Sequence, residues 1–514
     1  MKRAIAIYVA GFFVLACSSG ESSLDASATI DASVSSAPDA SAETGSETQV
    51  IRQFDNFDLT PFEETQPCVT WTLNNEKSLY VNTVTLSNRG AFHHSNWFVV
   101  PEDMYSGPDG FFDCDDRGFD ELSSAVSGAV LFAQSTQSIL EAQDLPEGVV
   151  IKIPPRHRVV AGVHLLNLSS RSMTTSMRMT LDLLHPQDVR VVAAPFRLGY
   201  GDLHIPPGGQ SRHTGECPMA ENYEAAAGRE FDMKLYYILP HYHALGDYFR
   251  LEVMGGPNDG MVIHEMVGFN AEANGRSFDP PIDLTGADGL RLTCGYNNLT
   301  TEEVGWGIGD QEMCEFLGLA DTGVMVDGWV RDHNFEGIEA DGVISYVSPC
   351  TTQAVPKNEA QTMPTAEEIA SPLYRPASDA DDPDVVPVDE CLDTPLDAVA
   401  TLAPTLSNIR EGILSSGCNY SSCHAGGTSA ANLDLTTADL HSRLVDVSSV
   451  AQPDMVLVKP GSPDESWLYQ LVSKCVPSAS DGSTSAHMPL NSPTLMDPGL
   501  VATIRDWISA GAPE

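Results

Sequence analysis

The sequence predicts a mainly β protein with two antiparallel β-sandwich lobes, followed by a small all-α domain. Residues 177–183 alternate apolar and polar side chains, as expected for a strand with one buried face. Residues 78–86 and 234–243 are rich in the aromatic and β-branched residues that favour strands. Gly and Pro interrupt the chain at short intervals, as in β-rich domains. Two antiparallel sandwiches would account for roughly 300 residues, so we assign the two lobes to 51–200 and 201–350.

The end of the chain predicts a helix. Asp497 is suited to cap it and Pro498 to its first turn, and an apolar stripe follows at helical spacing: Leu500, Ile504, Trp507 and Ile508. We assign this helix to a domain over 391–514. Because so short a domain buries a modest core, we expect Cys391 and Cys475 to stabilise it as a disulfide.

Composition limits the classes of partner. The 514 residues have room for about three domains, and a hydrophobic fraction of 42% is typical of folded proteins. Lys and Arg number 27 against 71 Asp and Glu, which gives a formal net charge of −44. This excess repels phosphate backbones, so we exclude nucleic acid as a partner and expect neutral or cationic ones.

The N-terminus predicts export. Lys2 and Arg3 precede an apolar run over 4–16, which fits a signal peptide and is too short to span a bilayer. The run ends at Leu15-Ala16-Cys17, which resembles the lipobox of bacterial lipoproteins. The resemblance implies a signal peptide over 1–17 and lipid attachment at Cys17, with the protein anchored to a membrane in the periplasm or at the cell surface. Plain secretion is the alternative.

Two further stretches do not have the composition of a folded core. Residues 18–50 lack aromatic residues and consist mostly of Ser, Ala, Asp, Glu and Thr, which predicts a flexible tether. Residues 351–390 alternate Pro with acidic residues, which predicts an extended linker between domains.

Five histidines and a methionine form the most informative pattern. They occur in the order HH, H, HxH and M: His93, His94, His164, His241, His243 and Met313. Residues two apart on a strand project from the same face, so we expect the HxH imidazoles to lie together. Imidazole binds several divalent metals, whereas a thioether favours copper, especially Cu(I). The other isolated histidines are assigned to ordinary core or surface positions: His157, His185, His204, His213, His264, His333 and His441.

This ordered set resembles the copper type II, ascorbate-dependent monooxygenases, which include peptidylglycine α-hydroxylating monooxygenase and dopamine β-hydroxylase. The resemblance covers about 60–350 and implies two coppers per chain, in two β-sandwich lobes that face each other across a cleft. It places an electron-relay copper on His93, His94 and His164. It places the copper that binds dioxygen, and with it the catalytic residues, at His241, His243 and Met313.

The cysteines fit this resemblance. Of 11 cysteines, Cys17 is assigned to lipid and two belong to a motif near the C-terminus, which leaves an even set of eight. The family has disulfides in both lobes, one of them beside the copper-binding Met, and this implies a Cys294–Cys314 pair. We pair the others as Cys68–Cys114 and Cys217–Cys350.

The sequence also departs from the family. Peptide-hydroxylating members place an Arg just before the HxH pair and a Tyr shortly after the Met, where they bind a substrate carboxylate. This chain has Ile238-Leu239-Pro240 and Glu315-Phe316-Leu317-Gly318 at those places. Neither anchor is present, which argues against a peptidylglycine substrate, and the resemblance together with the acidic charge predicts a small non-anionic one.

The C-terminal domain has a second redox motif. Cys418, Cys423 and His424 form C-x4-C-H, a lengthened version of the C-x-x-C-H haem attachment site. The domain resembles small c-type cytochromes of bacterial surface lipoproteins. The resemblance implies haem c bound to both cysteines, with His424 as the proximal ligand and Met488, or alternatively His487, as the distal ligand. The other interpretation is a haem-free module with a Cys418–Cys423 disulfide.

Together these features predict a copper monooxygenase that hydroxylates a C–H bond of a small molecule with dioxygen. The tethered haem, ascorbate or another one-electron donor would supply the electrons. The alternative is a surface electron-transfer or copper-binding lipoprotein without hydroxylase activity.

Overall fold

A computed structural model describes residues 48–514 with several gaps, and the structural statements below refer to the described residues. The gaps are 62, 135–139, 168–171, 244, 268–274, 299–300, 308–310, 380–390, 416–417, 419–423, 425–430, 432, 481 and 490–494, and the side chains of His93 and Gln134 are also not described. The expectations for Cys17, for residues 18–47 and for Cys423 therefore lie outside the described residues.

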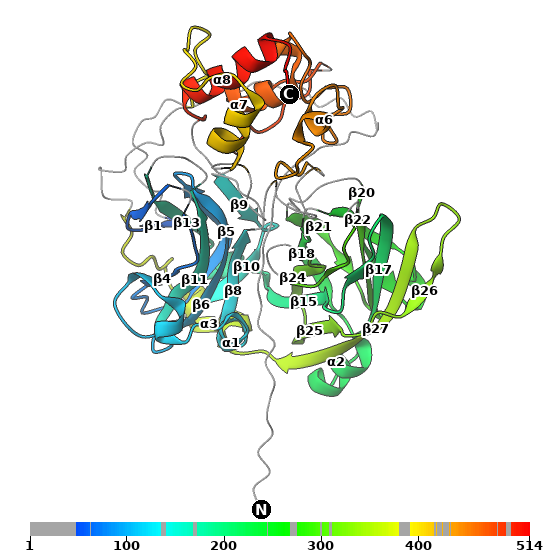
Figure 1. The fold of residues 1–514 in the computed structure, drawn as a ribbon. Coiled ribbons are helices and arrows are strands. Elements are labelled where there is room, and N and C mark those ends of the chain that lie inside the picture. The colour runs from blue at the N-terminus through cyan, green and yellow to red at the C-terminus, as the bar shows by residue number, and fades with distance from the viewer. Residues whose placement is uncertain are drawn as a thin grey trace, which may run out of the picture.

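The chain is mainly β, as the sequence predicts, and its two β lobes lie next to each other (Figure 1). The first lobe contains two six-stranded sheets, ordered β1-β13-β5-β10-β14 with β9 on β5, and β7-β4-β11-β6-β8 with β3 on β11. Their bounds are β1 (Gln49–Gln53), β3 (Glu64–Thr65), β4 (Cys68–Thr72), β5 (Leu79–Asn88), β6 (Phe92–Pro101), β7 (Gly110–Phe112), β8 (Ala129–Gln134), β9 (Leu140–Asp144), β10 (Val149–Ile153), β11 (His157–Leu166), β13 (Met177–Leu183) and β14 (Val191–Val192). The smaller elements are β2 (Phe57–Leu59), β12 (Met173–Thr175), η1 (Cys114–Arg117), α1 (Glu121–Ser127) and η2 (Pro186–Asp188).

The predicted strand over 177–183 is confirmed as β13. Its apolar residues, Met177, Met179, Leu181 and Leu183, are all buried, and the polar residues between them are partly exposed. Burying each such side chain contributes roughly 1.5–3 kcal/mol, so this alternation fixes which face of the strand meets the core.

The second lobe is built on one eleven-stranded sheet, ordered β20-β19-β22-β17-β27-β25-β15-β24-β18-β21 with β26 on β27. The bounds are β15 (Ala194–Tyr200), β17 (Gly209–Pro218), β18 (Lys234–His241), β19 (Gly246–Met254), β20 (Val262–Val267), β21 (Arg276–Asp283), β22 (Gly289–Asn298), β24 (Glu315–Asp321), β25 (Val324–Val330), β26 (Phe335–Ile338) and β27 (Ile344–Pro356). A separate pair, β16 (His204–Ile205) with β23 (Val304–Gly305), and the helical elements α2 (Ala220–Ala227) and η3 (Gly256–Asn258) complete the lobe.

Strand β27 joins the two halves of this long sheet. Its residues 344–349 run parallel to β17, and its residues 350–356 run antiparallel to β25. Pairs β15–β25 and β10–β14 are also parallel. The lobes therefore depart at these three pairs from the purely antiparallel arrangement that the sequence predicts, and the second lobe begins at β15, before residue 200.

After β27 the chain returns to the first lobe through a segment that we call the strap (residues 357–379), which contains η4 (Glu359–Gln361) and α3 (Ala366–Ala370). The Asn358 amide donates to the carbonyls of Val126 and Gly128, each at 2.8 Å, and the Tyr374 hydroxyl accepts from the backbone of Glu76 at 2.9 Å. The strap is folded, whereas the sequence predicts an extended linker over 351–390.

The C-terminal region contains short helices: α4 (Leu406–Ile409), the π-helix η6 (Arg410–Leu414), α6 (Leu440–Leu444), η8 (Pro463–Glu465), α7 (Trp467–Ser473) and α8 (Pro498–Ser509). The predicted last helix is confirmed as α8, with the Asp497 side chain accepting from the backbone of Gly499 at 2.8 Å. Ile504, Trp507 and Ile508 are buried on its inner face.

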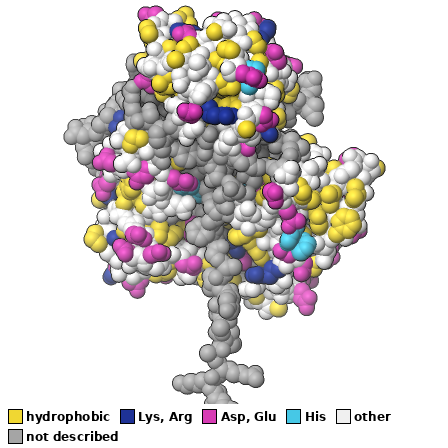
Figure 2. All heavy atoms as spheres, viewed as in Figure 1, with side chains coloured by type: hydrophobic (Ala, Val, Ile, Leu, Met, Phe, Trp, Pro, Cys, Tyr) yellow, Lys and Arg dark blue, Asp and Glu magenta, His cyan; other side chains and the backbone are white. Residues whose placement is uncertain are grey.

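All four predicted disulfides are present: Cys68–Cys114, Cys217–Cys350, Cys294–Cys314 and Cys391–Cys475. Disulfides persist in oxidising compartments, so these four fit an extracellular protein. Among the described residues, no helix is long and apolar enough to cross a membrane. Acidic side chains are spread over the visible face of both lobes (Figure 2), as the net charge of −44 requires.

Candidate functional site

Two of the three expected relay-copper ligands face each other on neighbouring strands. His94 on β6 is paired directly with His164 on β11, and both side chains are buried. His94 Nε2 and His164 Nδ1 are 2.9 Å apart. Two imidazole nitrogens that bind one metal ion lie roughly 3–4 Å apart, because metal–nitrogen bonds are about 2 Å long. The pairing of β6 with β11 in the first lobe therefore brings these two nitrogens close to the spacing that one metal ion needs.

Glu64 orients His164 from the other side of the ring. Its Oε1 is 2.8 Å from His164 Nε2, and this hydrogen bond lowers the pKa of the Glu64 carboxyl. A carboxylate on the second nitrogen of a histidine is the usual arrangement behind a metal-binding imidazole. The β6–β11 register shifts here, since Leu165 pairs with Phe92 and leaves His93 as the extra residue of a bulge.

Strand β18 ends at His241, and His243 follows two residues later, outside the strand on which the sequence predicts both histidines. His241 and His243 are 6% and 5% exposed, and their ring centroids are 5.2 Å apart. His243 Nδ1 is 2.7 Å from the carbonyl oxygen of Gln311, while its Nε2 is buried without a hydrogen-bond partner among the described residues. A carbonyl on Nδ1 fixes the tautomer that leaves Nε2 as the ligating atom.

Burial keeps both imidazoles neutral. It lowers the pKa of His243 to about 4 and that of His241 well below its ordinary value. A neutral ring is the form that binds a metal ion.

The segment Gln311–Met313 lies against the HxH pair. The buried carboxylate of Glu312 accepts from the backbone N–H of His243 at 2.8 Å and of Leu245 at 2.7 Å. Burial raises the pKa of Glu312 to about 8. Met313 is fully buried, and its carbonyl accepts from the Tyr296 hydroxyl. The predicted methionine ligand is thus in a segment fixed directly to His243.

The Cys294–Cys314 disulfide holds the next residue. Cys294 is on β22, and Cys314 lies between Met313 and β24. The bond ties the Met313 segment to the strand that also supplies Tyr296. The Cys294–Cys314 disulfide therefore lies next to Met313 in the chain, as expected.

A cavity of about 130 Å³ lies between the two lobes and reaches His241. The first lobe contributes Asn96, Phe98 and Glu121, and the second contributes Leu239 with His241 from β18 and Glu315 from β24. Most of the lining is apolar, with a few convergent polar groups, as in ordinary small-molecule sites.

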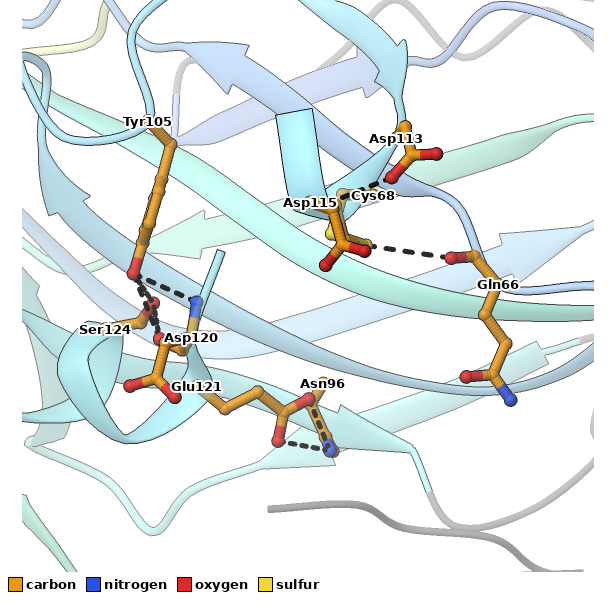
Figure 3. Close-up of a disulfide and its surroundings, with 10 residues drawn as sticks. Gln66, Cys68, Asn96, Tyr105, Asp113, Asp115, Asp120, Glu121 and Ser124 are labelled. Atoms are coloured by element: carbon orange, nitrogen blue, oxygen red, sulfur yellow. Dashed lines mark hydrogen bonds between the residues drawn. A yellow bond between two sulfur atoms is a disulfide. The ribbon is translucent and has the colours of Figure 1, made fainter. Parts of the chain in front are cut away.

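Helix α1 brings Glu121 to this cavity. The Asp120 side chain caps the helix by accepting from the Ser123 backbone at 2.7 Å, and the Tyr105 hydroxyl donates to the Asp120 carbonyl at 3.0 Å. The Asn96 amide approaches both carboxylate oxygens of Glu121 at 3.3 Å (Figure 3). Burial raises the pKa of Glu121 to about 8.

The opposite wall has one cation, which is already paired. Arg197 donates to Asp327 at 2.8 Å and lies 3.8 Å from Glu315. Burial raises the pKa of Glu315 to about 7, while the Arg197 charge opposes this shift. Among the described residues that line the cavity, no Lys or other Arg is present. The cavity therefore offers acidic groups and no unpaired cation.

The donor chemistry at both predicted copper sites fits copper. Four described imidazoles are buried, and they form two pairs whose members are neighbours: His94 with His164, and His241 with His243. Among the described residues, His243 Nε2 has no hydrogen-bond partner. A buried polar atom of this kind costs free energy unless something binds it. A metal ion would satisfy it.

The described haem-motif residues lie in the C-terminal region. His424 Nδ1 is 3.2 Å from the Leu433 carbonyl oxygen, which orients Nε2 as the ligating atom. Cys418 and Met488 both pack against the region's apolar core, and the Met488 N–H donates to the carbonyl of Leu471. Cys423, the other expected attachment residue, lies outside the described residues.

Four acidic residues of these sites are not among the residues that the sequence predicts: Glu64, Glu121, Glu312 and Glu315. Only Glu312 and Glu315 had a signal, because they flank Met313 and Cys314 in the sequence. Glu64 reaches His164 through the pairing of β3 with β11, and Glu121 reaches Asn96 through the packing of α1 against β6.

No family model and no curated protein matches the chain. Solved structures that align with it include the PBSX exported protein XepA (10% identity, 52% of this chain and 86% of that chain, TM-score 0.14). A viral capsid protein, infectious bursal disease virus VP2, aligns at 9% identity over 56% and 74% with a TM-score of 0.14. A putative secreted protein from Parabacteroides distasonis aligns at 10% over 55% and 85% with a TM-score of 0.11. At such low TM-scores these similarities carry no conclusion about fold or function.

Proposed function

We propose that the protein is an extracytoplasmic copper monooxygenase that hydroxylates a C–H bond of a small, non-anionic molecule. The observation that carries the proposal is the buried HxH pair, whose His243 Nε2 has no hydrogen-bond partner among the described residues, at the edge of a cavity between two lobes. The overall reaction combines substrate, dioxygen, two electrons and two protons into the hydroxylated product and water.

Two ligand sets hold the metal in this proposal. His93, His94 and His164 bind the relay copper, and His241, His243 and Met313 bind the copper at which dioxygen reacts. Copper in these sites supplies single-electron transfer and activation of dioxygen. The protein's own groups set the ligands: Glu64 orients His164, and the Gln311 carbonyl orients His243.

The cavity selects the substrate. Its apolar lining excludes water from the reacting bond. An anionic group entering it would lose its hydration without gaining a free cation, because Arg197 is occupied by Asp327. Neutral molecules, or cationic ones that pair with a carboxylate, bind there without this penalty.

Metal analysis combined with oxygen consumption tests the function. The mature protein should bind two coppers and, with ascorbate, consume dioxygen in the presence of some members of a panel of neutral and cationic aromatic compounds, but not of the matching carboxylates. Met313→Ile should abolish this consumption and spare the relay copper, whereas the exposed Met363→Ile should change neither. Activity that survives Met313→Ile would overturn the site assignment, and copper binding without any substrate-dependent consumption would favour an electron carrier.

The C-terminal domain is proposed to carry haem c as the electron donor. Cys418 and Cys423 would attach the haem, His424 and Met488 would ligate its iron, and a c-type haem supplies electrons one at a time. Denatured protein should retain a covalently bound haem spectrum. Cys418→Ala together with Cys423→Ala should remove that spectrum and leave turnover with ascorbate intact. Wild-type protein without bound haem would show that this module is haem-free.

A further inference from the structure

Three side chains that are far apart in the sequence meet on the surface of the second lobe. Asp202 lies between β15 and β16, His204 begins β16, and His333 follows the end of β25. One potential ligand atom from each lies within 4.8 Å of the other two. Histidine side chains bordered by acidic ones are visible on this lobe in Figure 2.

The Asp202 carboxylate bridges the two imidazoles. Its Oδ1 is 3.4 Å from His204 Nε2, and its Oδ2 is 2.7 Å from His333 Nδ1. The two ring centroids are 3.8 Å apart, with the ring planes inclined by 32°. Two imidazole nitrogens and a carboxylate form a set of three potential metal ligands.

Glu303 orients one of these rings. Its Oε1 is 2.9 Å from His204 Nδ1, the nitrogen that faces away from Asp202. Strands β16 and β23 position it, because His204 pairs with Gly305 on the opposite strand. A carboxylate on the far nitrogen fixes the tautomer of a metal-binding histidine, as Glu64 does for His164.

We propose that His204 Nε2, His333 Nδ1 and Asp202 bind a divalent transition-metal ion, with Zn²⁺ as the fitting representative. Nitrogen and oxygen donors without sulfur suit Zn²⁺, whereas Ca²⁺ and Mg²⁺ prefer oxygen ligands alone. This site is separate from both proposed copper sites and does not depend on the proposed monooxygenase function.

The ion would also fix the segment that contacts His243. At the end of β23, the Gly305 N–H donates to the Gln311 side chain at 2.8 Å, and the Glu312 N–H donates to the Gly305 carbonyl at 2.9 Å. A metal ion that joins β16 to the end of β25 therefore restrains β23 and, through these bonds, Gln311 and Glu312. Its role is structural support behind the HxH pair.

Zinc binding to the metal-free, full-length mature protein tests this proposal. His333→Gln and Asp202→Asn should each bind one Zn²⁺ fewer than the wild type, as measured by equilibrium dialysis and metal analysis. Asp332→Asn removes the same charge next to the site, and His185→Gln removes a histidine of the first lobe, so both controls should keep the wild-type stoichiometry. Because the copper ligands also bind zinc, His333→Gln is combined with His241→Ala, and the losses should add.

A second measurement reports the structural role. Zn²⁺ should slow hydrogen exchange at the amides of Gly305 and Glu312 in the wild type but not in Asp202→Asn. Equal zinc stoichiometry and affinity in the wild type and both ligand variants would overturn the proposal. Displacement of the bound zinc by an equimolar amount of Ca²⁺ would also overturn it, since that would indicate a carboxylate site without imidazole ligands.

Discussion

His241 and Glu315 are direct cross-strand partners, on β18 and β24 respectively, and both line the cavity between the lobes. Side chains paired in this way share one face of the sheet. The histidine of the proposed oxygen site is therefore next to a buried carboxyl group, on the wall against which a substrate would rest. Glu121 faces the same cavity from the other lobe.

Glu121→Gln should flatten the pH dependence of stability. Burial raises the pKa of Glu121 to about 8 from the ordinary 4.5, so the native state binds a proton that the unfolded state has lost over this range. The free energy of unfolding of the wild type therefore falls as the pH rises from about 4.5 to about 8. The Gln variant lacks this contribution and should have a higher Tm than the wild type at pH 8.5, but not at pH 4. Thermal unfolding over this pH range measures it, and parallel pH profiles would contradict the expectation.

Glu64→Gln should weaken the relay copper alone. The variant loses the charged partner of His164 Nε2, and loss of such a partner costs typically 10- to 100-fold in metal affinity. Chelator competition, with the two coppers distinguished in a Met313→Ile background, measures this. The neighbouring Glu63 bonds to Thr60 instead, so Glu63→Gln is the matched control. Equal affinity in the two variants would exclude the proposed role of Glu64.

Glu312→Ala should destabilise the second lobe. The buried N–H groups of His243 and Leu245 lose their common acceptor, and each unsatisfied group costs roughly 1–3 kcal/mol. We expect a loss of about 2–6 kcal/mol in urea unfolding, a smaller loss for Glu312→Gln, and no change for the exposed Glu336→Ala. A loss below 1 kcal/mol in the Ala variant would show that other acceptors replace the carboxylate.

Replacing Cys294 and Cys314 together by Ser should affect both stability and metal binding. The disulfide spans 20 residues, and closing a loop of this length is worth about 3 kcal/mol in the chain-entropy model. Because the bond holds the Met313 segment, copper affinity at the HxH site should also fall. Replacing Cys68 and Cys114 by Ser should destabilise the protein comparably without that effect. Identical copper affinity in the two double variants would show that the Cys294–Cys314 disulfide does not support copper binding at the HxH site.

Local pattern was sufficient for the elements that depend on it. The alternation in β13, the cap and stripe of α8 and the residues of the HxH pair are each encoded within about ten residues, so the sequence predicts them. The sequence also predicts the four disulfides, three of them with the help of the family resemblance.

Contacts between distant segments were not predictable in this way. Glu121 meets residues of the second lobe only across the cavity between the lobes, and Asp202, His204 and His333 meet only through the ends of three strands. The strap has the Pro-rich, acidic composition of a linker, and its anchors, Asn358 and Tyr374, are single residues with no periodic pattern around them.

The strap has a consequence for how the molecule unfolds. It leaves the second lobe at β27, and its Ala360 is buried in the core of the first lobe together with Tyr237 and Leu239 from the second. Neither lobe can lose its structure without exposing apolar surface of the other. We therefore expect the two lobes to melt in a single cooperative transition. A protease that cuts within residues 357–379 should leave two lobes, still joined between β14 and β15, that are each less stable than in the intact chain.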